Sequence, residues 1–207
     1  AGADLAEIQA LKTEAAAAAY ARDGQAAFDA WCALPFPTLA VIDGAALGGG
    51  LEFALACTFR AVTDGPKTSL GQPEVNLGII PGFGGTQRVL RRIGIEAGLA
   101  LILSGNPVTG KRAVELGLAD ALWPQAEADA RTAAFLREVS TEGGRRTALA
   151  RRPAPPTPAD TGKIVAQADE IFVKKVREKN PGPETALDLI ARTQDLPLAK
   201  GLAAAHE

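Results

Sequence analysis

The sequence contains one histidine, two cysteines and no methionine among its 207 residues. His206 is the penultimate residue, so a Ser-His-Asp or Cys-His apparatus would depend on the end of the chain, and the usual zinc ligand sets are excluded too. Cys32 and Cys57 lie in apolar, helix-like stretches, which favours buried free thiols in a reducing compartment over a disulfide. Because an initiator methionine is absent, we expect the native start to lie upstream of Ala1.

Strong charge of one sign and long apolar runs are also missing. The formal net charge is −2, with 22% charged and 47% hydrophobic residues, so the chain has no excess of positive charge that would attract nucleic acid. No apolar run approaches the roughly 20 residues that span a bilayer, and the start has no signal-peptide pattern. These observations predict a globular protein without a nucleic-acid partner or membrane span. We expect it in the cytoplasm, or in the mitochondrial matrix if the source is eukaryotic.

The first part of the chain is rich in alanine. Apolar residues at three-to-four spacing predict a helix from Asp4 to about Ala33, broken near Gly24. Asp4 and Glu7 form a capping box at its start. The next segment, "TLAVIDG" (38–44), is β-branched and apolar on both faces, which is typical of a buried strand.

Strands and helices alternate beyond this point. This alternation favours an α/β architecture over an all-helical or all-β one. The pattern predicts strands over 60–64 and 67–71, a short buried helix over 51–59, and further helices over 84–94, 95–103 and 111–116, with Val89, Leu90 and Ile93 facing inward in the first of these three.

A boundary follows at "RRPAPPTPAD" (151–160), where four prolines in ten residues forbid regular helix and favour an extended connector. We therefore expect a core over residues 1–150, the connector over 151–160, and a helical appendage or linker over 161–207.

Three glycines precede an acid in "GAALGGGLEFALAC" (44–57). Such a run permits close backbone packing, phosphate binding, or the exposure of N–H groups to a developing oxyanion. A phosphate loop needs a lysine and a hydroxyl after the glycines, and Leu51 and Glu52 stand there instead. The dinucleotide-binding glycine spacing is also absent. An oxyanion hole beside an acid and plain backbone packing therefore remain.

A second acid lies in "LGQPEVNLGIIPGFGGTQR" (70–88), where Glu74 follows a proline in an apolar, glycine-rich segment. Glu74 is either a surface glutamate or a carboxyl whose apolar surroundings raise its pKa, as a general acid requires. "AGADL" (1–5) is either an ordinary capped helix start or a source of backbone donors. Taken together, two glutamates beside glycine turns and two helix N-termini indicate enolate chemistry, with one water between two carboxylates whose pKa values are pushed apart.

These three stretches, followed by "ILSGNPVTGKRAVELGLADALWP" (102–124), resemble the ordered motifs of the crotonase, or enoyl-CoA hydratase/isomerase, superfamily. The resemblance covers roughly residues 1–124. It implies an α/β fold with a crotonase-like (ββα) spiral core and C-terminal helices. Because family members carry several core strands before "AGADL", we expect those front strands to be missing from this chain.

The resemblance also implies the roles of particular residues. The backbone N–H groups of Ala3 and Gly49 would form an oxyanion hole for the thioester carbonyl of an acyl-CoA. Glu52 would deprotonate the attacking water, and Glu74 would deliver a proton to the α-carbon. No metal and no cofactor is implied beyond the coenzyme A of the substrate. For Pro73 and Leu77, plain packing is an equal alternative to substrate binding. The residues expected along the acyl-CoA tunnel are Ala1, Asp4, Leu5, Ala45, Leu47, Gly48, Pro73, Leu77 and Gly82.

The expected function is that of a lyase that hydrates trans-2-enoyl-CoA to 3-hydroxyacyl-CoA in fatty-acid β-oxidation, with Δ3-Δ2 isomerisation in the same site. The alternative is a non-catalytic acyl-CoA-binding or assembly module, because the front strands are absent. The longer interval between Glu52 and Glu74 and the proline-rich connector are most similar to the hydratase domain of the multifunctional fatty-acid oxidation enzyme, alpha subunit. We accordingly expect a homotrimer or a domain of a larger multifunctional complex.

Overall fold

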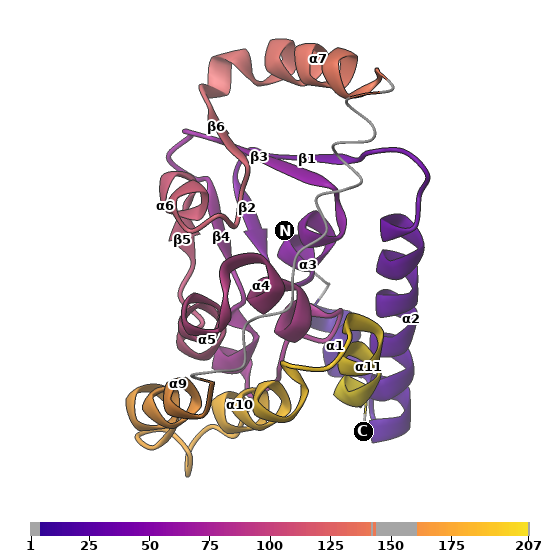
Figure 1. The fold of residues 1–207 in the computed structure, drawn as a ribbon. Helices are drawn as coiled ribbons and strands as arrows, with labels where there is room; N and C mark the ends of the chain where they lie inside the picture. Colours follow the sequence, from indigo (N-terminus) through magenta and orange to yellow (C-terminus); the bar gives the residue numbers. More distant parts are fainter. Residues whose placement is uncertain (1–4, 142, 144–160, 207) are drawn as a thin grey trace.

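A computed structural model describes residues 5–141, 143 and 161–206, and in this part of the chain two three-stranded sheets form the centre (Figure 1). The first sheet is parallel throughout and contains β1 (Leu39–Ile42), β3 (Phe59–Thr63) and β6 (Ala121–Trp123), in that order. In the second, β4 (Ser69–Gly71) pairs in parallel with β2 (Ala45–Leu47) and antiparallel with β5 (Val108–Thr109). The chain thus alternates between two sheets as it winds, which confirms the expected α/β class.

Helices link these strands and fill the core between them. They are α3 (Gly49–Ala56), the 3₁₀ turn η1 (Pro73–Leu77), α4 (Gly85–Ile93), α5 (Ile95–Ser104) and α6 (Gly110–Glu115). Leu51, Leu70, Leu99 and Ile102 are fully buried at the centre. In the parallel sheet β3 is buried at every position, as a central strand with helical cover requires. The expectation of a buried strand over 38–44 is wrong for β1, because β1 lies at the end of the strand order and Val41 is 38% exposed.

Helix α4 is buried almost all round. Val89 and Leu90 face the core as the periodicity predicts, and Ile93 packs against it. However, Gln87, Arg88 and Arg91 are buried as well. Sequence periodicity does not predict this burial, because their partners come from helices far away in the chain.

The helical start of the chain differs from expectation. Helix α1 (Leu5–Ala10) ends before Thr13, whose hydroxyl accepts a hydrogen bond from Ala16 N at 3.2 Å and caps α2 (Glu14–Cys32). The expected break near Gly24 is wrong, because α2 runs through it without interruption. A Cβ at Gly24 would lie 2.4 Å from ring atoms of Phe83, so this glycine admits an aromatic ring rather than ending a helix. The capping residue Asp4 lies outside the described residues.

The later helices cover opposite ends of the molecule (Figure 1). After the 3₁₀ turn η2 (Gln125–Glu127), α7 (Ala128–Val139) covers one face of the parallel sheet, with Phe135 and Val139 against Phe59. At the other end lie α9 (Thr161–Ala168), the π-helical turn η4 (Asp169–Val173), α10 (Gly182–Thr193), α11 (Leu198–Ala203) and the 3₁₀ turn η5 (Ala204–His206). Leu187 and Ile190 of α10 belong to the main core, so this segment packs on the core directly. The connector over 151–160 lies outside the described residues.

The two cysteines are free and occupy different environments. Cys57 is buried, and burial raises the pKa of its thiol. The expectation that Cys32 is buried is wrong: it is exposed at the end of α2, with its sulfur 3.2 Å from the carbonyl oxygen of Ala56. The apolar helix pattern does not reveal which face of its last turn meets solvent.

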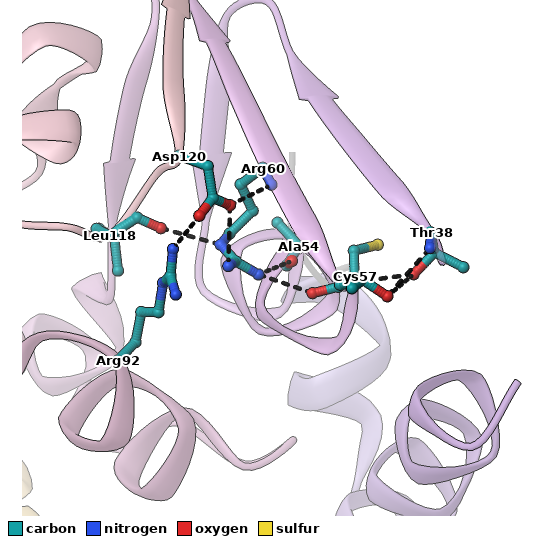
Figure 2. A network of polar contacts seen from close by, with 8 residues as sticks. Thr38, Ala54, Cys57, Arg60, Arg92, Leu118 and Asp120 are labelled. Carbon is teal, nitrogen blue, oxygen red and sulfur yellow. Dashed lines mark hydrogen bonds and ion pairs between the residues drawn. The ribbon is translucent and has the colours of Figure 1, made fainter. Parts of the chain in front are cut away.

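Arg60, on β3, ties the end of α3 to the rest of the core (Figure 2). Its guanidinium donates to the carbonyl oxygens of Cys57 at 2.7 Å and Leu118 at 3.0 Å, and it pairs with the Asp120 carboxylate at 3.2 Å. Asp120 also pairs with Arg92 of α4. The last carbonyls of a helix have no partner within it, so Arg60 caps α3 from the sheet.

Among the described helices, none is both long enough and apolar enough to cross a membrane.

We predict that Gly24→Ala destabilises the protein by about 1–3 kcal/mol, because the new methyl group meets the Phe83 ring in a packed cluster. Urea unfolding gives the difference. Gly162→Ala in α9 is the matched control, since nothing lies within 4 Å of its Cβ position. It should be neutral or stabilising by up to about 1 kcal/mol. Equal stabilisation by both substitutions would contradict the packing argument.

A second prediction concerns Arg60. Arg60→Met should lower the free energy of unfolding by about 3 kcal/mol, because it uncaps α3 and removes one partner of a buried ion pair. Arg112→Met breaks the exposed pair with Glu115 and should lower it by less than about 1 kcal/mol. Denaturant titration of both variants measures the contrast, and a loss at Arg60 no larger than at Arg112 would refute the capping role.

Candidate active site

Glu52 lies in the first turn of α3 and is only 1% exposed. Its Oε1 accepts hydrogen bonds from the backbone N–H groups of Gly85 at 2.6 Å and Phe83 at 2.8 Å. Gly84, between them, has φ +104°, and a Cβ at Gly85 would lie 2.9 Å from Oε1 of Glu52. Gly84 and Gly85 therefore allow the backbone of this turn to approach the Glu52 carboxyl.

The pKa of Glu52 is raised to about 8. Burial is the main cause and the charge of Glu74 is the second, while the amides of Gly85 and Phe83 and the Arg88 guanidinium act in the opposite direction. A buried carboxyl with these neighbours holds its proton near neutral pH and remains able to release it.

Glu74 lies in η1 and is half-buried, and burial raises its pKa to about 7. It lies over the start of α3, because a Cβ at Gly48 would be 2.7 Å from its Oε1. Two carboxyl groups that influence each other in this way titrate as a pair, so the pair carries about one proton at neutral pH. This is the charge state that an acid and a base acting together require.

Gln72 lies between the two acids and is fully buried. With its side-chain amide oriented so that the nitrogen faces Glu74, it donates to both carboxylate oxygens at 2.9 and 3.0 Å. The other side of the same amide lies against Gly85, which holds Glu52. The sequence analysis assigns no role to Gln72. A polar amide in an apolar segment, two positions before Glu74, could have indicated that it supports this carboxyl.

The backbone at Gly48 and Gly49 completes the arrangement. Gly48 has φ +53° and donates its N–H to the carbonyl oxygen of Gly71 at 2.9 Å. Gly49 is the first residue of α3, so its N–H has no acceptor within the helix, and no acceptor is found among the described residues. This donor lies at the positive end of the α3 dipole, where a negative oxygen is stabilised.

The structure thus brings four of the expected site residues together: Gly48, Gly49, Glu52 and Glu74. Ala45 and Leu47 lie on β2, while Pro73 and Leu77 belong to η1 with Leu77 57% exposed. Gly82 accepts a hydrogen bond through its carbonyl oxygen from Gln25 of α2 at 3.0 Å. Leu5 begins α1. The expected positions Ala1, Ala3 and Asp4 lie outside the described residues.

Aromatic side chains from α2 surround the turn that holds Glu52. The Phe83 ring contacts Tyr20 and Phe28 with centroids 5.4 and 5.6 Å apart. Phe53 of α3 contacts Phe28 and Trp31, and both Phe53 and Trp31 are about 40% exposed. These rings make the surroundings of the Phe83 turn apolar, which agrees with burial as the main cause of the raised pKa of Glu52.

Arg88 of α4 links the site to α2. It is 6% exposed, pairs with the Asp29 carboxylate at 2.5 Å and donates to the Cys32 sulfur at 3.2 Å. The positive charge of Arg88 also acts to lower the pKa of Glu52. Sequence periodicity does not reveal this role, because Arg88 and its two partners lie far apart in the chain.

Within the described residues, no group of three or more histidine, cysteine, aspartate and glutamate side chains could hold a metal ion.

Two three-stranded sheets joined by helices, with the carboxyl groups of Glu52 and Glu74 beside the N-terminus of α3, define an α/β protein with a pair of neighbouring acids. The chain belongs to the enoyl-CoA hydratase/isomerase family, whose model matches residues 1–152.

Solved structures agree with this assignment. An enoyl-CoA hydratase from Bacillus anthracis is 30% identical, with a TM-score of 0.65, and the match covers 86% of this chain and 70% of that one. An enoyl-CoA hydratase/carnitine racemase from Magnetospirillum magneticum is 26% identical, with a TM-score of 0.66 and coverage of 78% and 63%. An enoyl-CoA hydratase from Geobacillus kaustophilus is also 26% identical, with a TM-score of 0.60 and coverage of 84% and 65%. The matches thus span roughly two thirds of these relatives.

The raised pKa of Glu52 predicts how stability depends on pH. The folded protein retains the Glu52 proton up to about pH 8, whereas the unfolded chain loses it near pH 4.5. The stabilising contribution is therefore complete below about pH 4.5 and falls as pH rises towards 8. The free energy of unfolding should therefore fall less between pH 5 and 9 in Glu52→Gln than in the wild type, by at least about 1.4 kcal/mol. Denaturant unfolding over this pH range measures the difference. Glu96→Gln, at an exposed position, should keep the wild-type slope.

Proposed function

We propose that this protein hydrates trans-2-enoyl-CoA thioesters to 3-hydroxyacyl-CoA, as a lyase. The observation that carries the proposal is the coupled pair Glu52 and Glu74, with pKa values raised to about 8 and 7, beside the N–H of Gly49. Membership of the enoyl-CoA hydratase/isomerase family supports a thioester as the substrate class.

In this mechanism the thioester carbonyl oxygen accepts a hydrogen bond from the Gly49 N–H at the start of α3. The resemblance assigns the second donor to Ala3. The reaction starts from the state in which the one proton of the pair lies on Glu74 and Glu52 is ionised, and the similar pKa values of about 8 and 7 make this state accessible. As water attacks the β-carbon, its proton passes to the ionised Glu52 and its oxygen forms the new C–O bond. The electron pair of the double bond moves towards the thioester oxygen, where the helix dipole and the amide stabilise the enolate.

Glu74 completes the reaction. It gives its proton to the α-carbon, the enolate collapses, and the saturated 3-hydroxyacyl thioester is formed. One proton enters the pair at Glu52 and one leaves at Glu74, so transfer of a proton between the two carboxyls restores the starting state. Their similar pKa values favour this transfer, because neither group traps the proton.

The aromatic side chains near the site fit an apolar acyl chain. Phe53 and Trp31 are partly exposed beside the turn that carries Phe83. We further propose that the pathway is fatty-acid β-oxidation and that Glu74 also shuttles a proton between the α and γ positions in Δ3-Δ2 isomerisation. The resemblance to the multifunctional enzyme supports a domain within a larger assembly, with a homotrimer as the alternative.

A second candidate is a non-catalytic acyl-CoA-binding or assembly module. It is the alternative that the sequence analysis leaves open. Such a module would bind acyl-CoA in calorimetry without turnover, whereas the enzyme would show both.

Hydration of crotonyl-CoA, followed by loss of the conjugated thioester absorbance, tests the proposal. Glu52→Gln and Glu74→Gln should each lower kcat by roughly 10²- to 10⁴-fold, because glutamine transfers no proton. Glu96→Gln on the exposed face of α5 is the control and should keep the wild-type rate. Full activity in either site variant would refute the two-carboxyl mechanism, and binding without turnover by the wild type would support the module.

A further inference from the structure

The turn that carries Glu74 is attached to a segment more than a hundred positions downstream. Asn180, just before α10, donates from Nδ2 to the carbonyl oxygen of Val75 at 2.7 Å. Its Oδ1 accepts the N–H of Gly182 at 3.0 Å. Val75 follows Glu74 directly, so one side chain joins the backbone of the acid's turn to the start of α10.

The start of α10 also touches η1 through its backbone. A Cβ at Gly182 would lie 3.0 Å from the carbonyl oxygen of Val75 and 3.1 Å from that of Ile79. A side chain at this position would require these carbonyl oxygens to move by a few tenths of an ångström, so glycine suits the close approach of the two backbones. Behind it, Ala186, Leu187 and Ile190 anchor α10 in the main core. Asn180 is therefore attached to a rigid body.

The side chain of Val75 anchors η1 in the main core, where it is 1% exposed, but the rest of this turn is held more weakly. It is a 3₁₀ turn of five residues, and such short turns have poor hydrogen-bond geometry. Leu77 at its end is 57% exposed, and the Asn76 side chain reaches the carbonyl oxygen of Gly105 only at 3.3 Å. The shortest side-chain hydrogen bond recorded to the η1 backbone in the described residues is the one from Asn180.

We infer that Asn180 is a positioning residue, which acts through the Val75 carbonyl to hold the Glu74 carboxyl over Gly48 and beside Glu52. This inference rests on the proposed role of Glu74 in hydration and extends the acid–base site to the C-terminal helices. It explains why Asn180 and Gly182 stand together at the start of α10: the first holds the turn, and the second allows the close approach.

The discriminating variant is Asn180→Asp. It is isosteric, it keeps an acceptor for the Gly182 N–H, and its charge is favourable at the N-terminus of α10, so the helix start is preserved. It lacks the Nδ2 donor to Val75. Asn180→Ala removes both bonds. Gln125→Ala is the matched control, because this exposed side-chain amide donates to Asp43, in a different part of the molecule.

Steady-state hydration of crotonyl-CoA gives the first measurement. Both Asn180 variants should lower kcat by roughly 10- to 100-fold, because a displaced acid misses the α-carbon. Their KM should stay within about threefold, since Glu74 acts in the transition state and not in binding. Gln125→Ala should match the wild type. Wild-type kcat in Asn180→Asp would overturn the inference, and so would a loss confined to Asn180→Ala, which would assign the effect to the helix start.

The second measurement does not depend on activity. Titration of ¹³C-labelled glutamate carboxyls by NMR, with Glu74→Gln for assignment, reports the surroundings of Glu74 directly. Release of η1 should expose Glu74 to water and move its midpoint to lower pH, with Glu52 as its charged neighbour. An unmoved midpoint in both Asn180 variants would overturn the inference. If the wild type does not hydrate crotonyl-CoA, the proposed function fails, and this titration alone decides whether Asn180 positions Glu74.

Discussion

The hydrogen bonds from Gly85 and Phe83 to the buried carboxyl of Glu52 are the constraint on which the site depends. For these bonds to form, the turn at Gly84 and Gly85 must approach the first turn of α3 closely. A side chain at position 85 would block this approach, which explains the glycine there. The same contact sets the spacing of α3 and α4. It also joins two sequence motifs, some thirty residues apart, into one site.

The rest of the fold holds both ends of this contact. Arg60 caps the last turn of α3 and ties it through Asp120 to Arg92 of α4, so α3 is fixed at its C-terminus while its N-terminus carries the donor (Figure 2). On the other side, Arg88 links α4 to Asp29 of α2. A carboxyl buried in so rigid a frame has little water available to it, and this shortage of water raises its pKa.

The C-terminal helices belong to this frame as well. Gln87 of α4 donates to the Thr193 hydroxyl of α10 at 2.7 Å, and Arg91 donates to the carbonyl oxygen of Leu196 at 2.6 Å. These long-range bonds hold α4 against α10 and the segment that follows it.

The sequence by itself determined the class of fold and the candidate acids, because these depend on local patterns. Short stretches of the sequence contain the glycine runs beside Glu52 and Glu74 and show the alternation of strands and helices. Tertiary structure alone decided which polar residues support the acids. Arg88 and Asn180 have partners 59 and 105 positions away, and no periodicity encodes such contacts. Gly24 shows the same limit: locally it is a helix breaker, but the ring of Phe83 makes it a necessary part of an unbroken helix.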